Sequence, residues 1–324
     1  MVEMKSTQIG KKSMRLDQLL ENIKFLRSFL FRLLHKAKLI YLLLIFAISI
    51  GVSGWTVESN FIRIPLIGFH DIVDTQNPAQ LPPKRLAFSI DYTKQDLSVF
   101  LEYIMKENYW LLSSQDLYVY FIKKSQPIPA QRLGQKPIMI SFDDGYKGVH
   151  KNALPILEKL SAVHKKKGQF VLFVNPQFLG VDMGNKFIAH ASCNDFRDGY
   201  KKGFYDVQSH GFAHKNFTQI SGKELEIEIA KSKSELRKCM GDLDKNKVIG
   251  AHIAYPYGAS DWEVEEILPK YHLTGFLYDD NLFRVNRLQN NYRISRITVD
   301  KDMSPRALIS IAKKASTLRK KGWF

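Results

Sequence analysis

Short apolar runs alternate with longer segments of helical periodicity along most of this chain. The apolar runs have the length and content of buried strands; they are residues 64–69, 138–142, 169–174, 204–208, 248–255 and 273–278. The helical segments carry apolar residues three and four positions apart; they are residues 93–107, 151–164 and 222–240. This alternation predicts a parallel sheet with helices outside it, either as an open doubly wound sheet or as a barrel.

The N-terminal part follows a different pattern. Residues 39–52 are uncharged and strongly apolar, and a basic segment precedes them. That layout is typical of a signal anchor or a cleavable signal peptide, although the run is short for a full membrane span. We therefore expect a basic cytoplasmic leader at 1–38, a transmembrane signal anchor or signal peptide at 39–55, and a folded domain at 56–324, either membrane-anchored or secreted, on the extracytoplasmic side.

Charge and cysteine content narrow the choice of partners. The formal net charge is +16, of which residues 1–38 account for +6 and the remainder for +10. No cluster of Lys and Arg interleaved with aromatic residues forms a nucleic-acid-binding pattern, so we expect no nucleic-acid partner and instead a basic domain facing an anionic envelope or membrane surface. Cys193 and Cys239 are too few for a disulfide framework, and the sequence leaves open whether they form a single bridge.

Polar side chains follow the apolar run 138–142. Asp143 and Asp144 come directly after it, and Gly145 follows them. The run predicts a buried strand that places the two carboxylates at the rim of a sheet. Because successive strand side chains point in opposite directions, one aspartate can bind a metal ion while the other handles a proton. A plain Asp-Asp-Gly turn is the structural alternative.

Two histidines follow the strand predicted at 204–208. His210 and His214 are four residues apart, and on a helical turn that spacing would place both imidazoles on one face. Two histidines and one aspartate, each near a strand end, make a three-ligand metal site that leaves a position open for water, as a catalytic zinc-type site requires. Surface or capping histidines are the structural alternative.

A third motif is Tyr255-Pro256-Tyr257-Gly258. It predicts either a turn that simply closes a strand or a rigid loop that directs a backbone N–H at a developing oxyanion. Tyr146, Tyr255 and Trp262 are further aromatic candidates whose ring faces could stack on a ligand, with burial in the core as the alternative for each.

The three motifs in this order resemble those of the polysaccharide deacetylases, the family 4 carbohydrate esterases. The resemblance covers about residues 64–308 and implies a distorted, incomplete (β/α) barrel of the NodB-homology type. It implies removal of N-acetyl groups from a sugar polymer, with the site at the carboxyl ends of the strands. Carried over residue by residue, it makes Asp143 the catalytic base, Asp144, His210 and His214 the metal ligands, and the Tyr257 backbone N–H the oxyanion donor.

The chain departs from the usual family pattern at two points. It has Ala254 where the third motif normally carries an arginine that orients the base, and it has no histidine after His272 to serve as the general acid. These departures resemble the subgroup that deacetylates poly-β-1,6-N-acetylglucosamine, the biofilm exopolysaccharide. In that subgroup the acid comes from an N-terminal His-Asp motif. His70 then becomes the candidate acid, and Asp71 a candidate partner that fixes its tautomer.

Alternatives remain for the substrate and for the metal. The same chemistry suits a chitin-like or peptidoglycan polymer, and a protein of this fold can also bind polysaccharide without catalysis; retention of Asp143 and all three ligands favours an enzyme. Two histidines and one carboxylate favour a divalent metal cofactor such as zinc, and cobalt, nickel or iron fit the same ligands. The expected partners are an N-acetylglucosamine-containing polysaccharide and, through the N-terminal segment, a membrane.

Overall fold

The computed structural model describes residues 21, 23–36, 38, 40–47, 61–182, 188–285 and 290–319. The chain divides into two compact units, Met1–Asn60 and Phe61–Phe324. In the first unit, residues 23–36 and 40–47 are helical with exposed apolar side chains. Within the described part of the chain, no helix combines the length and the apolar content needed to cross a membrane. Residues 39 and 48–55 of the expected membrane segment lie outside the described residues.

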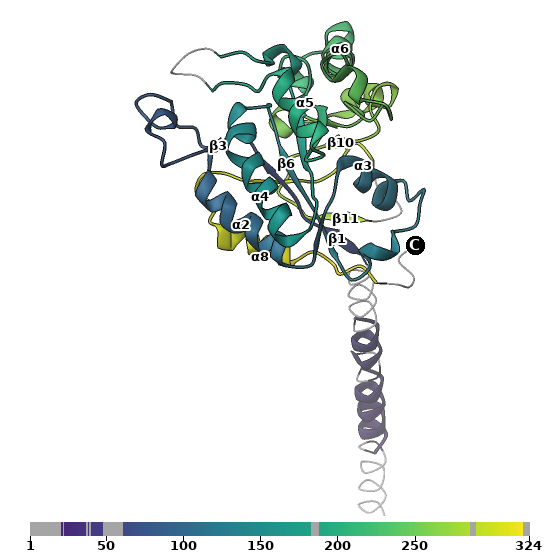
Figure 1. Ribbon diagram of the computed structural model, residues 1–324. Coiled ribbons are helices and arrows are strands. Elements are labelled where there is room, and N and C mark those ends of the chain that lie inside the picture. The colour runs from purple at the N-terminus through teal and green to yellow at the C-terminus, as the bar shows by residue number, and fades with distance from the viewer. Residues whose placement is uncertain are drawn as a thin grey trace, which may run out of the picture. The chain divides into compact units, whose positions relative to one another are not determined.

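The second unit is built on one parallel sheet with the strand order β10-β9-β8-β7-β6-β2-β12, and β5 pairs with the first half of β6 (Figure 1). Two small pairs lie outside this sheet, β1 with β11 and β3 with β4. The strands are β1 (Ile62–Ile64), β2 (Leu66–Phe69), β3 (Ile72–Val73), β4 (Tyr92–Thr93), β5 (Tyr109–Leu111), β6 (Lys136–Phe142), β7 (Phe170–Val174), β8 (Tyr205–Ser209), β9 (Ile253–Ala254), β10 (Gly275–Phe276), β11 (Phe283–Val285) and β12 (Ile297–Thr298).

Helices cover the outer face of the sheet, with α2, α4 and α8 side by side in Figure 1. The helices are α2 (Lys94–Lys106), α3 (Ser114–Asp116), α4 (Leu154–His164), α5 (Cys193–Lys201), α6 (Gly222–Met240), α7 (Trp262–Ile267) and α8 (Pro305–Lys313). Shorter 3₁₀ or π turns are η1 (Pro78–Gln80), η2 (Leu117–Ile122), η3 (Ala130–Arg132), η4 (Val149–Ala153), η5 (Pro176–Phe178), η6 (Phe217–Gln219), η7 (Gly241–Leu243), η8 (Pro256–Gly258) and η9 (Leu268–Lys270). Helix α2 begins after Thr93, whose side chain accepts a hydrogen bond from the Asp96 N–H, as an N-cap residue does.

The central strands are buried on both faces, which explains their nearly continuous apolar sequences. Phe170, Leu172 and Val174 of β7 pack in the cluster that includes α2 and α4 side chains. Val171 and Phe173, which point the other way, pack in a second cluster enclosed by the curved sheet. The sheet is not completely closed: next to β10, only an isolated bridge between Phe276 and Ile294 continues the pairing towards β12. The expected incomplete α/β barrel is confirmed.

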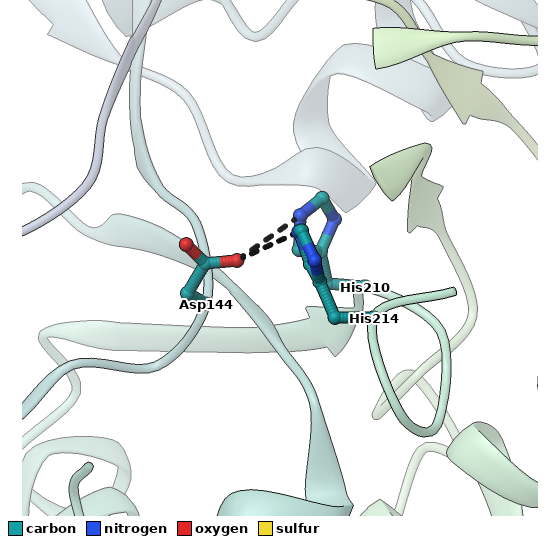
Figure 2. A group of neighbouring side chains, drawn as sticks. All are labelled: Asp144, His210 and His214. Carbon is teal, nitrogen blue, oxygen red and sulfur yellow. Dashed lines mark ion pairs between the residues drawn. The ribbon is translucent and has the colours of Figure 1, made fainter. Parts of the chain in front are cut away.

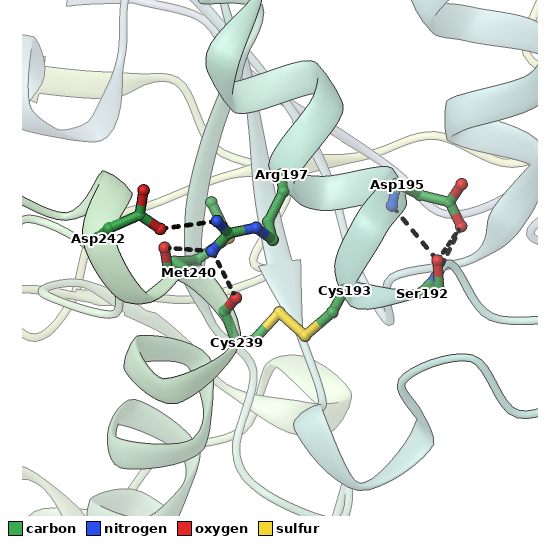
Figure 3. The surroundings of a disulfide bond; sticks show 7 residues. All are labelled: Ser192, Cys193, Asp195, Arg197, Cys239, Met240 and Asp242. Atoms are coloured by element: carbon green, nitrogen blue, oxygen red, sulfur yellow. Dashed lines mark hydrogen bonds and ion pairs between the residues drawn. A yellow bond between two sulfur atoms is a disulfide. The ribbon is translucent and has the colours of Figure 1, made fainter.

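A disulfide bond joins Cys193, at the start of α5, to Cys239, near the end of α6 (Figure 3). Next to it, Arg197 donates hydrogen bonds to the backbone carbonyls of Cys239 and Met240 and pairs with Asp242 at 2.7 Å. The single bridge that the sequence left open is therefore present, and it ties together two helices that follow different strands.

Candidate active site

Two neighbouring regions of the sheet bring the aspartates and histidines together at the carboxyl ends of the strands. Asp143 follows β6, and its backbone N–H donates to the Phe69 carbonyl of β2 at 2.9 Å. His210 follows β8, and its N–H donates to the Val174 carbonyl of β7 at 3.0 Å. The parallel ladder therefore fixes both residues at the same edge of the sheet, although they are far apart in sequence.

Asp144, His210 and His214 form the candidate metal group (Figure 2). Asp144 Oδ1 lies 3.4 Å from His210 Nε2 and 3.2 Å from His214 Nε2, and among the described residues this buried oxygen accepts no hydrogen bond of regular geometry. Donor atoms around one tetrahedral ion at ~2.0–2.2 Å lie about 3.3–3.6 Å apart. The spacing, the orphaned carboxylate oxygen and the donor types together fit a divalent transition metal.

Backbone contacts orient the first histidine. The Nδ1–H of His210 donates to the Ala254 carbonyl at 2.9 Å, which leaves Nε2 unprotonated and directed at Asp144. The Asn175 side chain also holds this loop, because its amide nitrogen donates to the carbonyls of His210 and Gly211. Ala254 thus supports the site through its main chain, although it lacks the arginine side chain that the family motif usually has at this position.

The expected helical turn between His210 and His214 is wrong. The segment is an irregular loop, and Gly211 and His214 have positive φ angles of 75° and 57°. Two left-handed residues turn the chain back on itself, which brings the second imidazole beside the first, with ring centroids 5.1 Å apart. Glycine adopts such angles without strain, whereas a histidine does so only where its surroundings hold it.

The local electrostatic field favours a cation at this group. Burial lowers the pKa of His210, but the Asp143 and Asp144 carboxylates outweigh burial and leave this pKa raised overall. For Asp144, burial opposes ionisation, yet the imidazoles of His210, His70 and His214 hold its pKa well below the usual range. Burial and the neighbouring His210 lower the pKa of His214. A metal ion would compete with protons here, so binding should weaken at low pH.

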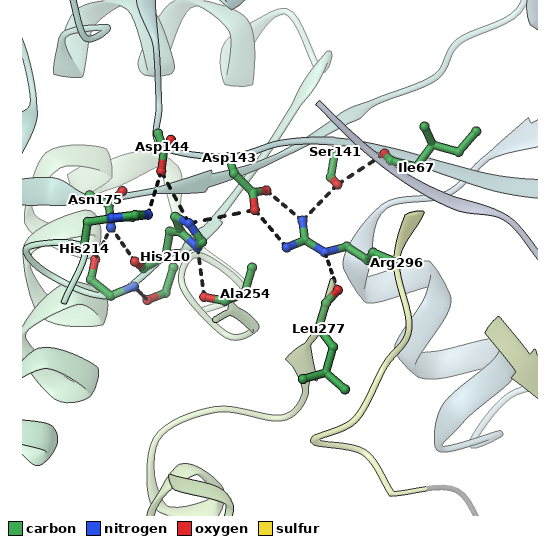
Figure 4. Close-up of polar contacts among 12 residues, drawn as sticks. Ile67, Ser141, Asp143, Asp144, Asn175, His210, His214, Ala254, Leu277 and Arg296 are labelled. Atoms are coloured by element: carbon green, nitrogen blue, oxygen red, sulfur yellow. Dashed lines mark hydrogen bonds and ion pairs between the residues drawn. The ribbon is translucent and has the colours of Figure 1, made fainter. Parts of the chain in front are cut away.

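Asp143 is held by a side chain that sequence reasoning missed, Arg296 (Figure 4). Arg296 Nη1 and Nη2 donate to the two oxygens of Asp143 at 2.7 and 2.8 Å, and both side chains are fully buried. Arg296 is itself fixed by Ser141 Oγ at 3.2 Å and by the Leu277 carbonyl at 3.3 Å. Burial alone would raise the pKa of Asp143, but the guanidinium and His210 outweigh burial and lower it. Asp143 is therefore ionised and rigid.

His70 lies at the end of β2, within the field of the same carboxylates. Burial lowers its pKa, and Asp143 and Asp144 offset part of that effect. Its Nδ1 is buried without a hydrogen-bond partner. The expected contact with Asp71 is wrong: that carboxylate accepts hydrogen bonds from Ile72 N–H and Arg85 instead, at 2.9 and 3.0 Å.

Tyr257 borders the metal group on its open side. Its φ is 61°, and its ring, which is 67% exposed, lies 4.7 Å from the His214 ring. An open cleft of about 600 Å³ begins here and is lined by His214, Lys215, Asn216, Gln219, Ile220 and Tyr257. Of the other aromatic candidates, Tyr255 is fully buried and cannot stack on a sugar, whereas Trp262 is 74% exposed.

The two side chains that sequence reasoning missed come from the C-terminal third of the chain. Arg296 precedes β12, and Tyr278, whose ring lies against His70 and Arg296, follows β10. A signal for the arginine did exist: a buried base needs a cation, and Ala254 cannot supply one. Nothing in the sequence chose Arg296 among the many basic residues, because its proximity depends on the parallel pairing of β12 with β2.

Comparison with known proteins agrees with this site. Residues 130–276 match the family model of polysaccharide deacetylases, a segment that contains both aspartates and both histidines of the site but not His70 or Arg296. No curated protein sequence shows significant similarity to the chain.

Three solved structures share the fold at low sequence identity. The Streptococcus pyogenes deacetylase PplD in complex with acetate is 20% identical over 78% of this chain and 99% of its own, with a TM-score of 0.62. IcaB from Ammonifex degensii is 17% identical over 78% and 96%, with a TM-score of 0.58. A de-N-acetylase from Aggregatibacter actinomycetemcomitans is 14% identical over 77% and 99%, with a TM-score of 0.56. The chain therefore contains, over residues 130–276, a segment that matches the polysaccharide deacetylase family model and holds both aspartates and both histidines of the site.

Proposed function

We propose that this protein hydrolyses N-acetyl groups of an N-acetylglucosamine polysaccharide, poly-β-1,6-N-acetylglucosamine in particular, in a metal-dependent reaction. The observation that carries the proposal is that two groups of side chains meet at one edge of the sheet. The first is the candidate metal group of Asp144, His210 and His214, and the second is the ionised Asp143 held by Arg296. The first group can bind a metal ion that acts as a Lewis acid, and the second can act as a general base.

Asp143 serves as the base in this proposal. Arg296 occupies both of its oxygens in the plane of the carboxylate, and one oxygen also lies 3.8 Å from His210 Nε2, so the carboxylate faces the metal group without belonging to it. A divalent ion, for which we propose zinc, would polarise the acetyl carbonyl and make the attacking water more acidic. Asp143 takes the proton from that water, and Arg296 keeps the carboxylate aimed while it does so.

His70 serves as the general acid for the departing amine. It follows β2, the strand that pairs with β6 beside Asp143, and its Nδ1 is buried within the protein. Its lowered pKa makes the imidazolium a strong proton donor but also reduces the protonated fraction as the pH rises. The proposal therefore implies that activity declines on the alkaline side as His70 loses its proton.

The Tyr257 backbone N–H is the proposed oxyanion donor. Its positive φ turns the peptide away from the direction that an extended chain would take. Tyr257 lies beside the His214 ring and lines the cleft. A donor fixed by the main chain needs no reorganisation when negative charge develops on the acetyl oxygen. The exposed Tyr257 ring then faces the polymer.

The choice of the β-1,6-linked polymer rests on the N-terminal position of the proposed acid. In this proposal His70 takes the place of the missing C-terminal histidine, as the resemblance to the subgroup implies, and Arg296 takes the place of the missing motif arginine. Chitin-like and peptidoglycan polymers remain the second candidates, because the site itself recognises only an N-acetyl group and one sugar.

We also propose that the enzyme acts outside the cytoplasm, where the N-terminal unit anchors it to the membrane or directs its export. The exposed side chains of residues 23–34 and 40–46 include many large apolar ones, and basic residues flank them. The Cys193–Cys239 disulfide supports the same location, because such bonds persist in oxidising compartments.

Acetate release from defined oligomers tests the activity. The full-length protein, reconstituted with zinc, should release acetate from β-1,6-linked N-acetylglucosamine oligomers faster than from β-1,4-linked ones. Removal of the metal by a chelator should abolish release, and zinc should restore it. Equal rates on both linkages would contradict the polymer assignment, and the absence of release from either would contradict the activity.

A further inference from the structure

Tyr278 lies in the middle of the site without an assigned role. It follows β10, and its buried hydroxyl makes no hydrogen bond of regular geometry with the described residues but faces the Asp143 carboxylate; burial, together with this carboxylate, raises the pKa of Tyr278. Its ring contacts two groups of the proposed machinery: the His70 ring stacks on it with centroids 5.8 Å apart and an interplanar angle of 29°, and the Arg296 guanidinium lies 3.9 Å from the ring centroid. The phenol therefore lies between the proposed acid and the partner of the proposed base.

The backbone of β2 is adapted to this ring. A Cβ atom at Gly68 would lie 2.2 Å from the Tyr278 hydroxyl oxygen and 2.6 Å from its ring. Alternate residues of a strand share a side, so the place where a side chain of residue 68 would lie is next to the His70 imidazole. Tyr278 occupies that place, and it can do so because residue 68 has no side chain.

His70 lacks the partner that usually fixes an acid–base histidine. Such an imidazole is normally held by a carboxylate or carbonyl at its second nitrogen, whereas Nδ1 of His70 has no partner among the described residues. Asp71, its sequence neighbour, is engaged by Arg85. In the part of the chain that the structure describes, stacking on Tyr278 is the one aromatic contact that His70 makes.

The aromatic face, not the hydroxyl, makes these contacts. Aromatic rings stack favourably on one another and attract a guanidinium above their face, whereas the hydroxyl faces Asp143 and does not contact His70. Arg296 has further anchors in Asp143, Ser141 and the Leu277 carbonyl, and His70 does not. Loss of the ring should therefore disturb the acid much more than the base.

We infer that Tyr278 is a positioning residue, whose ring holds the His70 imidazole in place of the usual carboxylate. The inference rests on the proposed function, because it assumes that His70 donates a proton to the leaving amine. It predicts that the ring matters for substrates with a poor leaving group and matters little for those that need no proton.

Two substitutions separate the ring from the hydroxyl: Tyr278→Phe and Tyr278→Leu. Each full-length variant is loaded with zinc, its metal content is measured, and its kcat is determined on an N-acetylglucosamine oligomer and on an activated aryl acetate. Tyr278→Phe keeps the ring on His70, so the ratio of its oligomer rate to its ester rate should stay within about threefold of the wild-type ratio. Tyr278→Leu should bind zinc normally and lose ~10–100-fold on the oligomer, part of what a general acid contributes, while ester hydrolysis changes less than about fivefold. Tyr271→Leu, at a tyrosine whose hydroxyl contacts Glu226, is the control for removing a phenol elsewhere.

The possible results distinguish the inference from the proposed function. A Tyr278→Leu variant that retains the oligomer rate, or loses both rates equally, would overturn the inference while the wild-type activity stands. A Tyr278→Phe variant whose ratio of oligomer rate to ester rate falls as far as that of Tyr278→Leu would also overturn it, because the hydroxyl would then be the essential part. If the wild-type protein released no acetate at all, the proposed function would fail, and the inference that rests on it would fail too.

Discussion

At the scale of single residues, the pairing of Asp143 with Arg296 determines how the base behaves. Neither side chain has any exposed surface, so each charge depends on the other for compensation. The lowered pKa of Asp143 means that ionisation of this group stabilises the folded protein above the ordinary carboxyl range, and that this stabilisation is lost as the pH falls through the lowered value.

Substitution of Arg296 by Met should therefore be costly in a pH-dependent way. At pH 7 it leaves a buried carboxylate without a cation, which costs ~3–5 kcal/mol of unfolding free energy. The loss of unfolding free energy should be smaller in acid, where Asp143 can be protonated. Because Asp143 would then be protonated more readily, the acid limb of the kcat/KM profile should move to higher pH. Denaturant unfolding at pH 7 and pH 4, with Arg296→Lys as the charge-preserving control, measures this. An equal loss of stability at both pH values would argue against the pairing.

Asp143 and His70 should differ in the substrates on which they matter. Asp143→Asn preserves the shape of the side chain but removes the base, so zinc should stay bound while both amide and activated ester hydrolysis fall by ~10²–10⁴-fold. His70→Ala should also retain zinc, but it should spare the ester, because an aryl leaving group needs no proton. The ratio of the two rates in each variant is the measurement. A His70→Ala variant that lost zinc, or lost both activities equally, would remove His70 from the role of acid.

At the scale of elements, the disulfide joins segments that the sheet alone does not hold together. Cys193 and Cys239 are 46 residues apart, and in the chain-entropy model a loop of that size is worth about 4 kcal/mol. A Cys193→Ser/Cys239→Ser variant should therefore unfold at lower denaturant concentration, by up to that free energy, while kcat in the folded state is retained. Unfolding of the oxidised wild type, compared with the variant under the same conditions, measures the difference. Identical midpoints would mean that the bridge does not form in solution.

The elements also show how far the sequence could predict this fold. Helix α6 matches the range predicted from its periodicity, and α2 differs by one residue at each end from the predicted range 93–107, because local pattern determines both. The strand expected at 273–278 is only Gly275–Phe276, since the incomplete closure of the sheet limits its pairing. The loop from His210 to His214 was predicted as a helical turn, because spacing alone does not reveal the left-handed angles of Gly211 and His214.

The candidate site was predictable in so far as it follows strand ends. Asp143, Asp144 and His210 lie where their motifs placed them, because each ends or follows a short apolar run. Arg296 and Tyr278 were not predictable, because they come from segments near the edge of the sheet that only tertiary pairing brings to the centre. Asp71 was assigned on sequence adjacency to His70, but its carboxylate turns to Arg85 instead.

At the scale of the whole molecule, the proposed location outside the cytoplasm can be tested in intact cells. The full-length protein should fractionate with membranes, and its catalytic unit should be open to protease added from outside the cytoplasmic membrane. Cys193 and Cys239 should resist alkylation until a reductant is added, because the bridge forms in an oxidising compartment. A soluble cytoplasmic protein with an intact N-terminus and two reactive thiols would refute both the anchor and the signal-peptide proposals.

The central claim is that Asp144, His210 and His214 hold the ion on which deacetylation depends. His214→Gly tests it most directly, because glycine suits the positive φ of this position and the side chain is 26% exposed. His164→Ala is the matched control. His164 is the last residue of α4, its imidazole contacts Glu102 of α2, and α4 leads away from the edge of the sheet where the candidate site lies. Zinc content and acetate release are measured on both variants and on the wild-type protein.

In His214→Gly, zinc affinity and acetate release should both fall by at least ~10²-fold, because losing a ligand costs more than losing one of its supporting contacts. His164→Ala should match the wild type in both respects. A folded His214→Gly variant with full zinc occupancy and undiminished acetate release would contradict the account.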